Sequence, residues 1–194
     1  MFTKYLLLGL TVISLILAGC TISTHKERGE NGENNKDVDI RTPLGSISVH
    51  KGGATAKETG LASYPGAQLK TDAEDEDSSA NVNISSSLFG GLKVVAAKYR
   101  SDDSPDKVLA FYRKELAHYG NVVDCTGGFN MRFEAHHKDD PVSCNGDHGS
   151  DHDYKEELKV GTENNQRIMA VKPAGKGSEF ALVYVRAHDN KDSM

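Results

Sequence analysis

Four histidines and five aspartates gather in one polar stretch of the sequence, residues 134–155. The histidines are His136, His137, His148 and His152. Neutral imidazole is a good ligand for zinc, copper or nickel. His148 and His152 would lie on one side of a helical turn, although Gly146 and Gly149 disfavour a helix there. The stretch is therefore interpreted either as a solvated loop or as a zinc or copper site built on the four histidines.

Three cysteines, Cys20, Cys125 and Cys144, could add thiol chemistry. As thiolates, Cys125 and Cys144 could complete a tetrahedral metal site with two of the histidines. The chain has no Cys-x-x-Cys motif, and in an exported protein an even pair of cysteines favours a disulfide. Such a bond would close a loop of about 20 residues and stabilise the fold by about 3 kcal/mol.

The sequence has none of the common catalytic motifs. The patterns Gly-x-Ser-x-Gly and His-Glu-x-x-His, the Walker loop and the dinucleotide fingerprint are all absent. Asp102 and Asp103 precede a predicted helix, where helix capping explains them at least as well as an acid–base pair does. The acidic run 72–77 lacks the spacing of a calcium-binding EF-hand and is interpreted as a solvated loop. The protein is therefore expected not to be an enzyme, with a hydrolase of envelope polymers as an alternative.

Composition and charge narrow the class of protein further. The chain has 194 residues, with 23 Lys and Arg against 28 Asp and Glu and a formal net charge of −5. Binding to nucleic acid needs a basic surface, so no nucleic-acid partner is expected. This length favours one domain or at most two. No cofactor is expected beyond the zinc or copper of the alternative site.

The first 20 residues have the character of a targeting segment. Lys4 is the only charge before an apolar run over residues 5–17, which is short of the roughly 20 residues that span a membrane. The ending Leu17-Ala18-Gly19-Cys20 resembles the lipobox of bacterial lipoproteins. The resemblance implies a signal peptide over 1–19, acyl chains on Cys20 that anchor the protein in the cell envelope, and, because Thr21 follows, the outer membrane if the host is Gram-negative. A plain membrane anchor and an ordinary secretory signal are the alternatives.

The rest of the chain divides into segments of different composition. Residues 20–36 are polar after the lipidated Cys20 and are expected to form a flexible tether. Apolar and polar residues alternate over 37–50 on both sides of Pro43-Leu44-Gly45, which predicts a β-hairpin. A linker over 51–61, a domain over 62–188 and a disordered tail over 189–194 complete the expected organisation.

One helix and about seven strands are expected in the domain. The helix spans 105–119, with Ser104 as cap, Pro105 in the first turn and Gly120 after its end. The expected strands are 81–89, 92–100, 121–125, 129–135, 157–161, 167–172 and 179–186, the last of them central because it is almost continuously apolar. The predicted fold class is α+β: a mostly antiparallel sheet covered on one face by the single main helix, with a small N-terminal β-hairpin.

Two motifs of the domain resemble those of small, uncharacterised bacterial lipoproteins. They are Tyr64-Pro65-Gly66-Ala67 and the pattern Ser104-Pro105, Val108, Phe111-Tyr112, Leu116. The resemblance covers roughly residues 62–188 and implies a secreted α+β module of unassigned function, with no active site to carry over. The hairpin segment 40–49 is also similar to strand repeats of surface adhesins.

These observations lead to one expected function and two alternatives. The protein is expected to be an exported lipoprotein that acyl chains hold on a membrane. It would serve as a non-catalytic binding or structural module, with an envelope protein or polymer as its partner. The alternatives are a periplasmic zinc- or copper-binding protein using His136, His137, His148 and His152, and the hydrolase named above.

Overall fold

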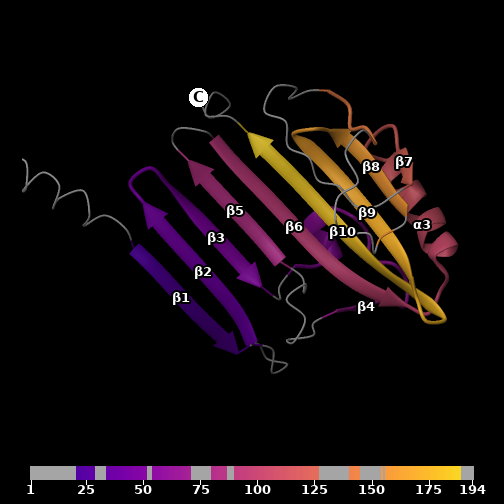
Figure 1. Ribbon diagram of the computed structural model, residues 1–194, viewed down its shortest axis with the longest axis horizontal. Helices are drawn as coiled ribbons and strands as arrows, with labels where there is room; N and C mark the ends of the chain where they lie inside the picture. Colours follow the sequence, from indigo (N-terminus) through magenta and orange to yellow (C-terminus); the bar gives the residue numbers. More distant parts are fainter. Residues whose placement is uncertain are drawn as a thin grey trace, which may run out of the picture.

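A computed structural model of the chain describes residues 21–28, 34–51, 54–70, 80–86, 90–126, 140–144, 154 and 156–188. These residues form one ten-stranded antiparallel sheet and two helices (Figure 1). The strands are β1 (Thr21–Arg28), β2 (Asn34–Thr42), β3 (Gly45–Lys51), β4 (Gln68–Leu69), β5 (Ala80–Ser86), β6 (Gly90–Ser101), β7 (Val123–Thr126), β8 (Glu156–Thr162), β9 (Asn165–Ala174) and β10 (Gly177–His188). The helices are α2 (Ala56–Thr59) and α3 (Pro105–Ala117).

The strand order brings the early and the late strands of the chain together in the middle of the sheet. Its order is β1-β2-β3-β5-β6-β10-β9-β8-β7, and the short β4 pairs with β6 beside this path. The early strands therefore form one half of the sheet and the late strands form the other (Figure 1). The two halves meet where β6 pairs with β10, from Ser101 opposite Ser178 to Gly91 opposite His188.

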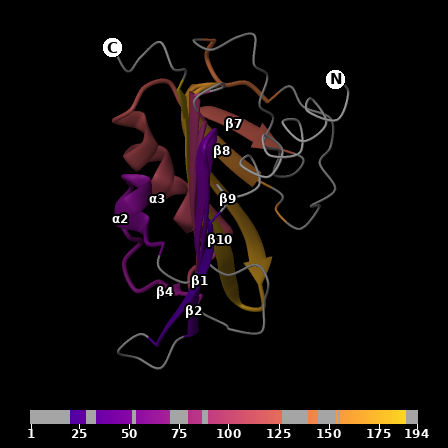
Figure 2. The same cartoon turned by 90° about the vertical axis from the view of Figure 1, so that its left-hand side faces the viewer.

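Both helices pack on the same face of the sheet, over its later half (Figure 2). The core there combines Val95 and Tyr99 of β6, Phe180 and Leu182 of β10, and the buried side of α3, formed by Val108, Leu109, Tyr112 and Leu116. The ring centroids of Tyr112 and Phe180 lie 5.5 Å apart. Burying each of these side chains stabilises the fold by about 1.5–3 kcal/mol, so this cluster fixes the helix on the sheet.

Strand β10 is buried on both faces, as its almost continuously apolar sequence predicts. Phe180 and Leu182 point toward the helices, whereas Val183 and Val185 belong to a separate cluster with Ile168. Successive side chains of a strand point to opposite faces, so a strand with cover on both sides needs apolar residues at every position. The predicted central position of this strand is confirmed.

The predicted fold class is wrong. We expected an α+β domain in which one helix covers a face of the sheet, but the described chain is mostly a single large sheet, and its helices are 13 and 4 residues long. The N-terminal hairpin is also no separate unit. Strand β3 pairs with β5, with Ile47 opposite Ile84, so the hairpin of β2 and β3 continues into the main sheet. The pairing of β3 with β5 could not be predicted from the sequence, because the two strands are far apart along the chain and their hydrogen bonds are made by the backbone.

Some segments differ from the expected organisation. Strand β1 and the first residues of β2 lie in the range expected to be a tether, and α2 lies in the range expected to be a linker. Because β1 is an edge strand that pairs only with β2, it needs few apolar side chains. The expected signal peptide over 1–19, the expected tail over 189–194 and the strand expected at 129–135 lie outside the described residues. Within the described ranges, neither helix has the length and apolar character needed to cross a membrane.

Candidate functional site

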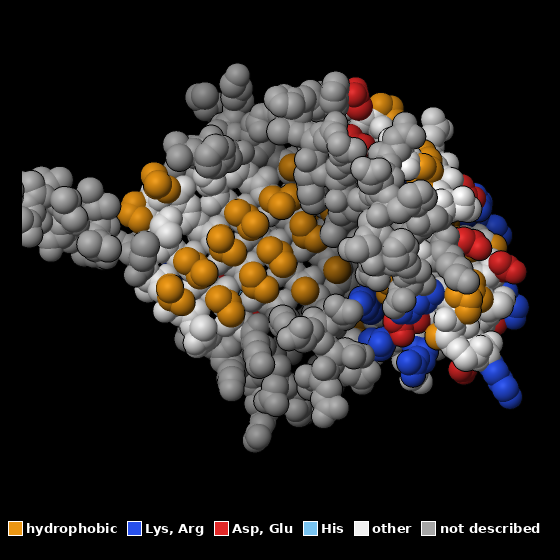
Figure 3. All heavy atoms as spheres, viewed as in Figure 1, with side chains coloured by type: hydrophobic (Ala, Val, Ile, Leu, Met, Phe, Trp, Pro, Cys, Tyr) orange, Lys and Arg blue, Asp and Glu red, His pale blue; other side chains and the backbone are white. Residues whose placement is uncertain are grey.

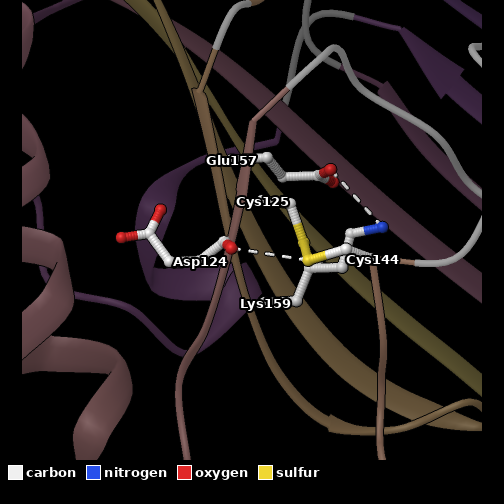
Figure 4. Close-up of a disulfide and its surroundings, with 5 residues drawn as sticks. All are labelled: Asp124, Cys125, Cys144, Glu157 and Lys159. Atoms are coloured by element: carbon white, nitrogen blue, oxygen red, sulfur yellow. Dashed lines mark hydrogen bonds and ion pairs between the residues drawn. A yellow bond between two sulfur atoms is a disulfide. The ribbon is translucent and has the colours of Figure 1, made fainter.

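A disulfide joins the edge strand β7 to the short segment 140–144 (Figure 4). The sulfur atoms of Cys125 and Cys144 lie 2.10 Å apart, so the two cysteines expected to pair have disulfide geometry. The backbone N–H of Val142 donates to the carbonyl oxygen of Gly161 at 3.1 Å, and Pro141 forms a bridge with Thr162. The disulfide therefore fastens this segment beside β8.

A buried ion pair lies next to the disulfide (Figure 4). Lys159 Nζ is 3.4 Å from Glu157 Oε2, and less than a tenth of either side chain is exposed. Both residues belong to β8, and Glu157 lies opposite Cys125 across the strand pair. Burying two charges costs solvation energy that their attraction only partly returns, so the pair needs close geometry to persist. Removing either partner would therefore leave a buried charge with less compensation beside the disulfide.

A second group of charges surrounds Glu179 of β10. Its carboxylate lies 3.2 Å from Lys70 Nζ, 3.5 Å from Lys172 Nζ and 3.9 Å from Arg100 Nη2. The cations come from the residue after β4, from β9 and from β6. One mostly buried carboxylate thus links β10 to β9, to β6 and to the residue after β4, so the charge of Glu179 is compensated within the central strand.

The start of α3 holds the carboxylate that the sequence offered as part of an acid–base pair. Lys107 Nζ donates to Asp103 Oδ1 at 2.7 Å, and the Tyr64 hydroxyl donates to Asp103 Oδ2 at 2.9 Å. The bond from Lys107, followed by that from Tyr64, lowers the pKa of Asp103 below its usual value. Burial, followed by the contact with Asp103, raises the pKa of Tyr64. Asp103 thus connects the helix to the preceding chain.

A broad apolar area lies on the sheet face opposite the helices, over the early half of the sheet (Figure 3). We call it the open face and define it by eleven aliphatic residues: Ile22 in β1, Val38 and Ile40 in β2, Ile47 and Val49 in β3, Ala80, Val82 and Ile84 in β5, and Leu92, Val94 and Ala96 in β6. Ile22 is 68% exposed, Ile47 39% and Ile84 36%, and the other eight are half-buried.

The register of the strands places these side chains in continuous rows. One row runs through Ile22, Ile40, Ile47, Ile84 and Leu92, each directly opposite the next. A second row runs through Val38, Val49, Val82 and Val94. Residues directly opposite in an antiparallel pair share a face and have their Cβ atoms about 5 Å apart. The open face is therefore one unbroken aliphatic surface across five strands.

The other face of β2, β3 and β5 is polar, whereas that of β6 carries Val95 and Ala97 of the core under the helices. The polar side chains form cross-strand contacts: His50 Nδ1 lies 3.1 Å from Asp37 Oδ1, Ser48 donates to Asp39 at 2.5 Å, and the hydroxyls of Ser46 and Ser85 are 2.8 Å apart. Strands β2, β3 and β5 thus have one face suited to water and one that is not. Exposed apolar patches of several hundred Å² mark interaction sites in soluble proteins, so the open face is the candidate functional site.

The open face continues into the core of the molecule. Leu92, Val94 and Ala96 pack against the buried residues Ile168, Val183 and Val185 of the later half. Val94 lies directly opposite Val185 of β10. The β6 side of the open face is therefore continuous with a buried cluster of the later half.

The other residues that the sequence singled out lie outside the described part of the chain. They are Cys20, His136, His137, His148 and His152. Among the described residues, no group of three or more His, Cys, Asp and Glu side chains could hold a metal ion. Acylation of Cys20 and a zinc or copper site on the histidines stay predictions.

Sequence reasoning predicted most strands of the open face but missed the surface itself. The alternation of residues 37–50 was visible, whereas the partner of Ile47 lies 37 positions further along the chain. Comparison of the chain with protein-family models, with curated proteins and with solved structures gives no match.

Proposed function

We propose that the protein is an exported, lipid-anchored protein of the cell envelope whose sheet serves as a non-catalytic binding or structural module. The observation that carries this proposal is the position of the open face. Its first residue, Ile22, is two positions after Cys20, the residue that would carry the acyl chains. An aliphatic surface beside a lipid anchor is suited to contacts made at the membrane.

The cysteine pair supports export. Disulfides persist in oxidising compartments such as the periplasm and are rare in the cytosol, where thiols are kept reduced. Cys125 is buried and is joined to Cys144, which leaves Cys20 as the one cysteine of the chain outside this pair. Two cysteines in a disulfide and a third available for acylation are what we expect of an exported lipoprotein.

The start of β1 supports a location close to the membrane. Thr21 already lies opposite Arg41 in the sheet, so an anchor at Cys20 would join the lipid to an edge strand with no intervening chain. The early half of the sheet would be held near the lipid surface, and an envelope protein or polymer would be the partner. In a Gram-negative host, the location we propose is the outer membrane.

Intact-mass spectrometry of the full chain, expressed in a bacterium and recovered from the membrane fraction, tests this proposal. We expect a mature chain that begins at Cys20, carries acyl chains and gains two hydrogen atoms on reduction of the Cys125–Cys144 bond. A Cys20→Ser variant, expressed in parallel, should lose the acyl chains and leave the membrane fraction. An unacylated wild-type protein in the cytosol would reject the proposal.

A further inference from the structure

We propose that the open face binds the open face of a second copy of this chain, so that two anchored molecules pack sheet against sheet on the same membrane. The inference rests on the proposed lipid anchor. It names the partner that the proposed function leaves unspecified.

The area of the open face is that of an interaction surface. A residue on one face of a sheet occupies about 33 Å², the product of a strand spacing of about 4.8 Å and a two-residue repeat of about 6.8 Å. Eleven residues therefore present roughly 360 Å², which lies within the range of the largest, often functional, patches on monomeric proteins. Two such faces in contact would bury roughly twice that area, less than the about 1,200 Å² of a stable complex.

This comparison predicts a pair that is weak in dilute solution and forms at a membrane. Two copies anchored in one bilayer are confined to a thin layer, which raises their effective concentration without any new contact. Anchors at Cys20 would also hold both copies by the same end of their sheets. We therefore expect the small aliphatic interface to form when both copies are in one membrane.

The free edge of the sheet argues against direct burial of the open face in lipid. Among the described strands, β1 is the last one on its side of the sheet, and Ile22 of the open face belongs to it. Sinking the face into hydrocarbon would bring the unpaired backbone groups of this edge into a medium without hydrogen-bond partners, which costs several kcal/mol for each group. Packing against another protein surface leaves that edge in water.

The chemistry of the face favours an identical partner. All eleven residues are aliphatic, so the face has no charge or aromatic anchor that would select a different surface. Two sheets pack about 10 Å apart through interlocking aliphatic side chains, as in a β-sandwich. A two-fold axis places the same patch on both partners, and homodimer interfaces are the most apolar class. The open face has the composition of one half of such a core.

Cross-linking in membranes tests the pairing. Ile47 lies on β3, the middle strand of the open face, so a cysteine there would meet its own copy near the two-fold axis. We would introduce Ile47→Cys into the full chain and treat isolated membranes with a bis-maleimide whose span matches the about 10 Å between packed sheets. Ser46→Cys, on the polar face of the same strand, is the matched control. We expect at least tenfold more cross-linked homodimer with Ile47→Cys.

A second pair of variants tests whether the apolar contact drives the association. Ile84→Lys places a charge on the open face, and Ser85→Lys places the same charge on the opposite face of the same strand. In the Ile47→Cys background, Ile84→Lys should lower the dimer yield at least tenfold, while Ser85→Lys should leave it unchanged. Retention of the Cys125–Cys144 bond reports on the later half of the sheet, and a limited-proteolysis pattern like that of the wild type shows that the early half is intact in each variant.

Several outcomes would overturn the inference. Equal cross-linking from both faces would do so, as would adducts with a different protein, or a thiol at position 47 that reacts only with lipid-soluble maleimides. The same membranes separate this failure from failure of the proposed function. An acylated, membrane-bound protein that forms no homodimer rejects the pairing alone, whereas a protein missing from the membrane fraction rejects the lipid anchor.

Discussion

Single residues hold the later half of the sheet together by contacts between distant parts of the chain. Tyr112 of α3 is fully buried, and its hydroxyl donates to the carbonyl oxygen of Ala62 at 3.1 Å. Burial raises the pKa of this hydroxyl well above its usual value, so it stays protonated and donating. The Tyr119 hydroxyl donates to the carbonyl oxygen of Gly60, and the Arg167 guanidinium lies over the Tyr119 ring, 3.8 Å from its centroid. These contacts fix the chain around α2 against α3 and β9.

The disulfide yields a stability prediction. Replacing both cysteines in a Cys125→Ala, Cys144→Ser variant should lower the free energy of unfolding by about 3 kcal/mol, because the bond closes a loop of 19 residues in the unfolded chain. Urea denaturation with and without reductant measures this. Reductant should destabilise the wild type and leave the double variant unchanged. A double variant as stable as the oxidised wild type would contradict the prediction.

The contact between Lys107 and Asp103 predicts a pH dependence. Because the pKa of Asp103 is lower in the folded state than its ordinary value of 3.8, ionised Asp103 stabilises the fold above that pH. The stabilisation is lost as the pH falls through the lowered pKa. Lys107→Ala removes the largest cause of the shift, so the pKa of Asp103 should rise toward 3.8 and the variant should be less stable than the wild type at neutral pH.

An NMR titration of the Asp103 carboxyl carbon measures this pKa directly. Lys114→Ala removes another lysine of α3 and serves as the control, with no change expected in the titration of Asp103. The unfolding curves of the wild type and Lys107→Ala should converge at the acid end. An Asp103 that titrates alike in both proteins would refute the assignment.

Helix α3 is the element that fixes the later half of the sheet, and its two sides should differ in their tolerance of substitution. Leu116 is fully buried on the sheet side, so Leu116→Ala should cost about 2–5 kcal/mol through lost burial and a cavity. Lys114 is exposed, and Lys114→Ala should change stability by less than about 0.5 kcal/mol. Thermal or urea unfolding compares them, and equal losses would mean that α3 does not pack as described.

The elements of the fold differ in how far the sequence predicts them. Helix α3 is foreseeable because local features define it, namely Pro105 in the first turn and apolar residues at helical spacing, and it ends at Ala117, two residues before the expected end. Strand β1 is not foreseeable in the same way, because its polar sequence matches that of a flexible tether. Strand β1 is ordered by backbone hydrogen bonds to β2, and the side chains of β1 give no sign of this pairing.

The open face, too, could be predicted from the sequence only in part. Alternation in β2 and β3 predicted strands with one apolar face, but the area of that face depends on which strands meet. The pairing of β3 with β5, and of β5 with β6, merges three short patterns into one surface. The disulfide, by contrast, was predictable by counting cysteines once Cys20 was assigned to the lipid.

The whole molecule is asymmetric in how its sheet is covered. The later half has helices on one face (Figure 2) and the disulfide-linked segment at its far edge, while β2, β3 and β5 have one polar face and one aliphatic face (Figure 3 shows the aliphatic one). Exposing the aliphatic face to water costs free energy, and contact with a partner would remove that cost. We therefore propose that the open face is covered when the protein is on its membrane.

Thiol labelling in membranes tests that claim most directly. Ile84→Cys and Ser85→Cys place a thiol at exposed positions on opposite faces of β5. Each full-length variant would be treated with a water-soluble maleimide, first in isolated membranes and then in nanodiscs that hold a single copy. The account predicts that Ile84→Cys reacts at least tenfold more slowly in membranes than in single-copy nanodiscs, while Ser85→Cys reacts equally in both. Equal rates for Ile84→Cys in the two settings would contradict it.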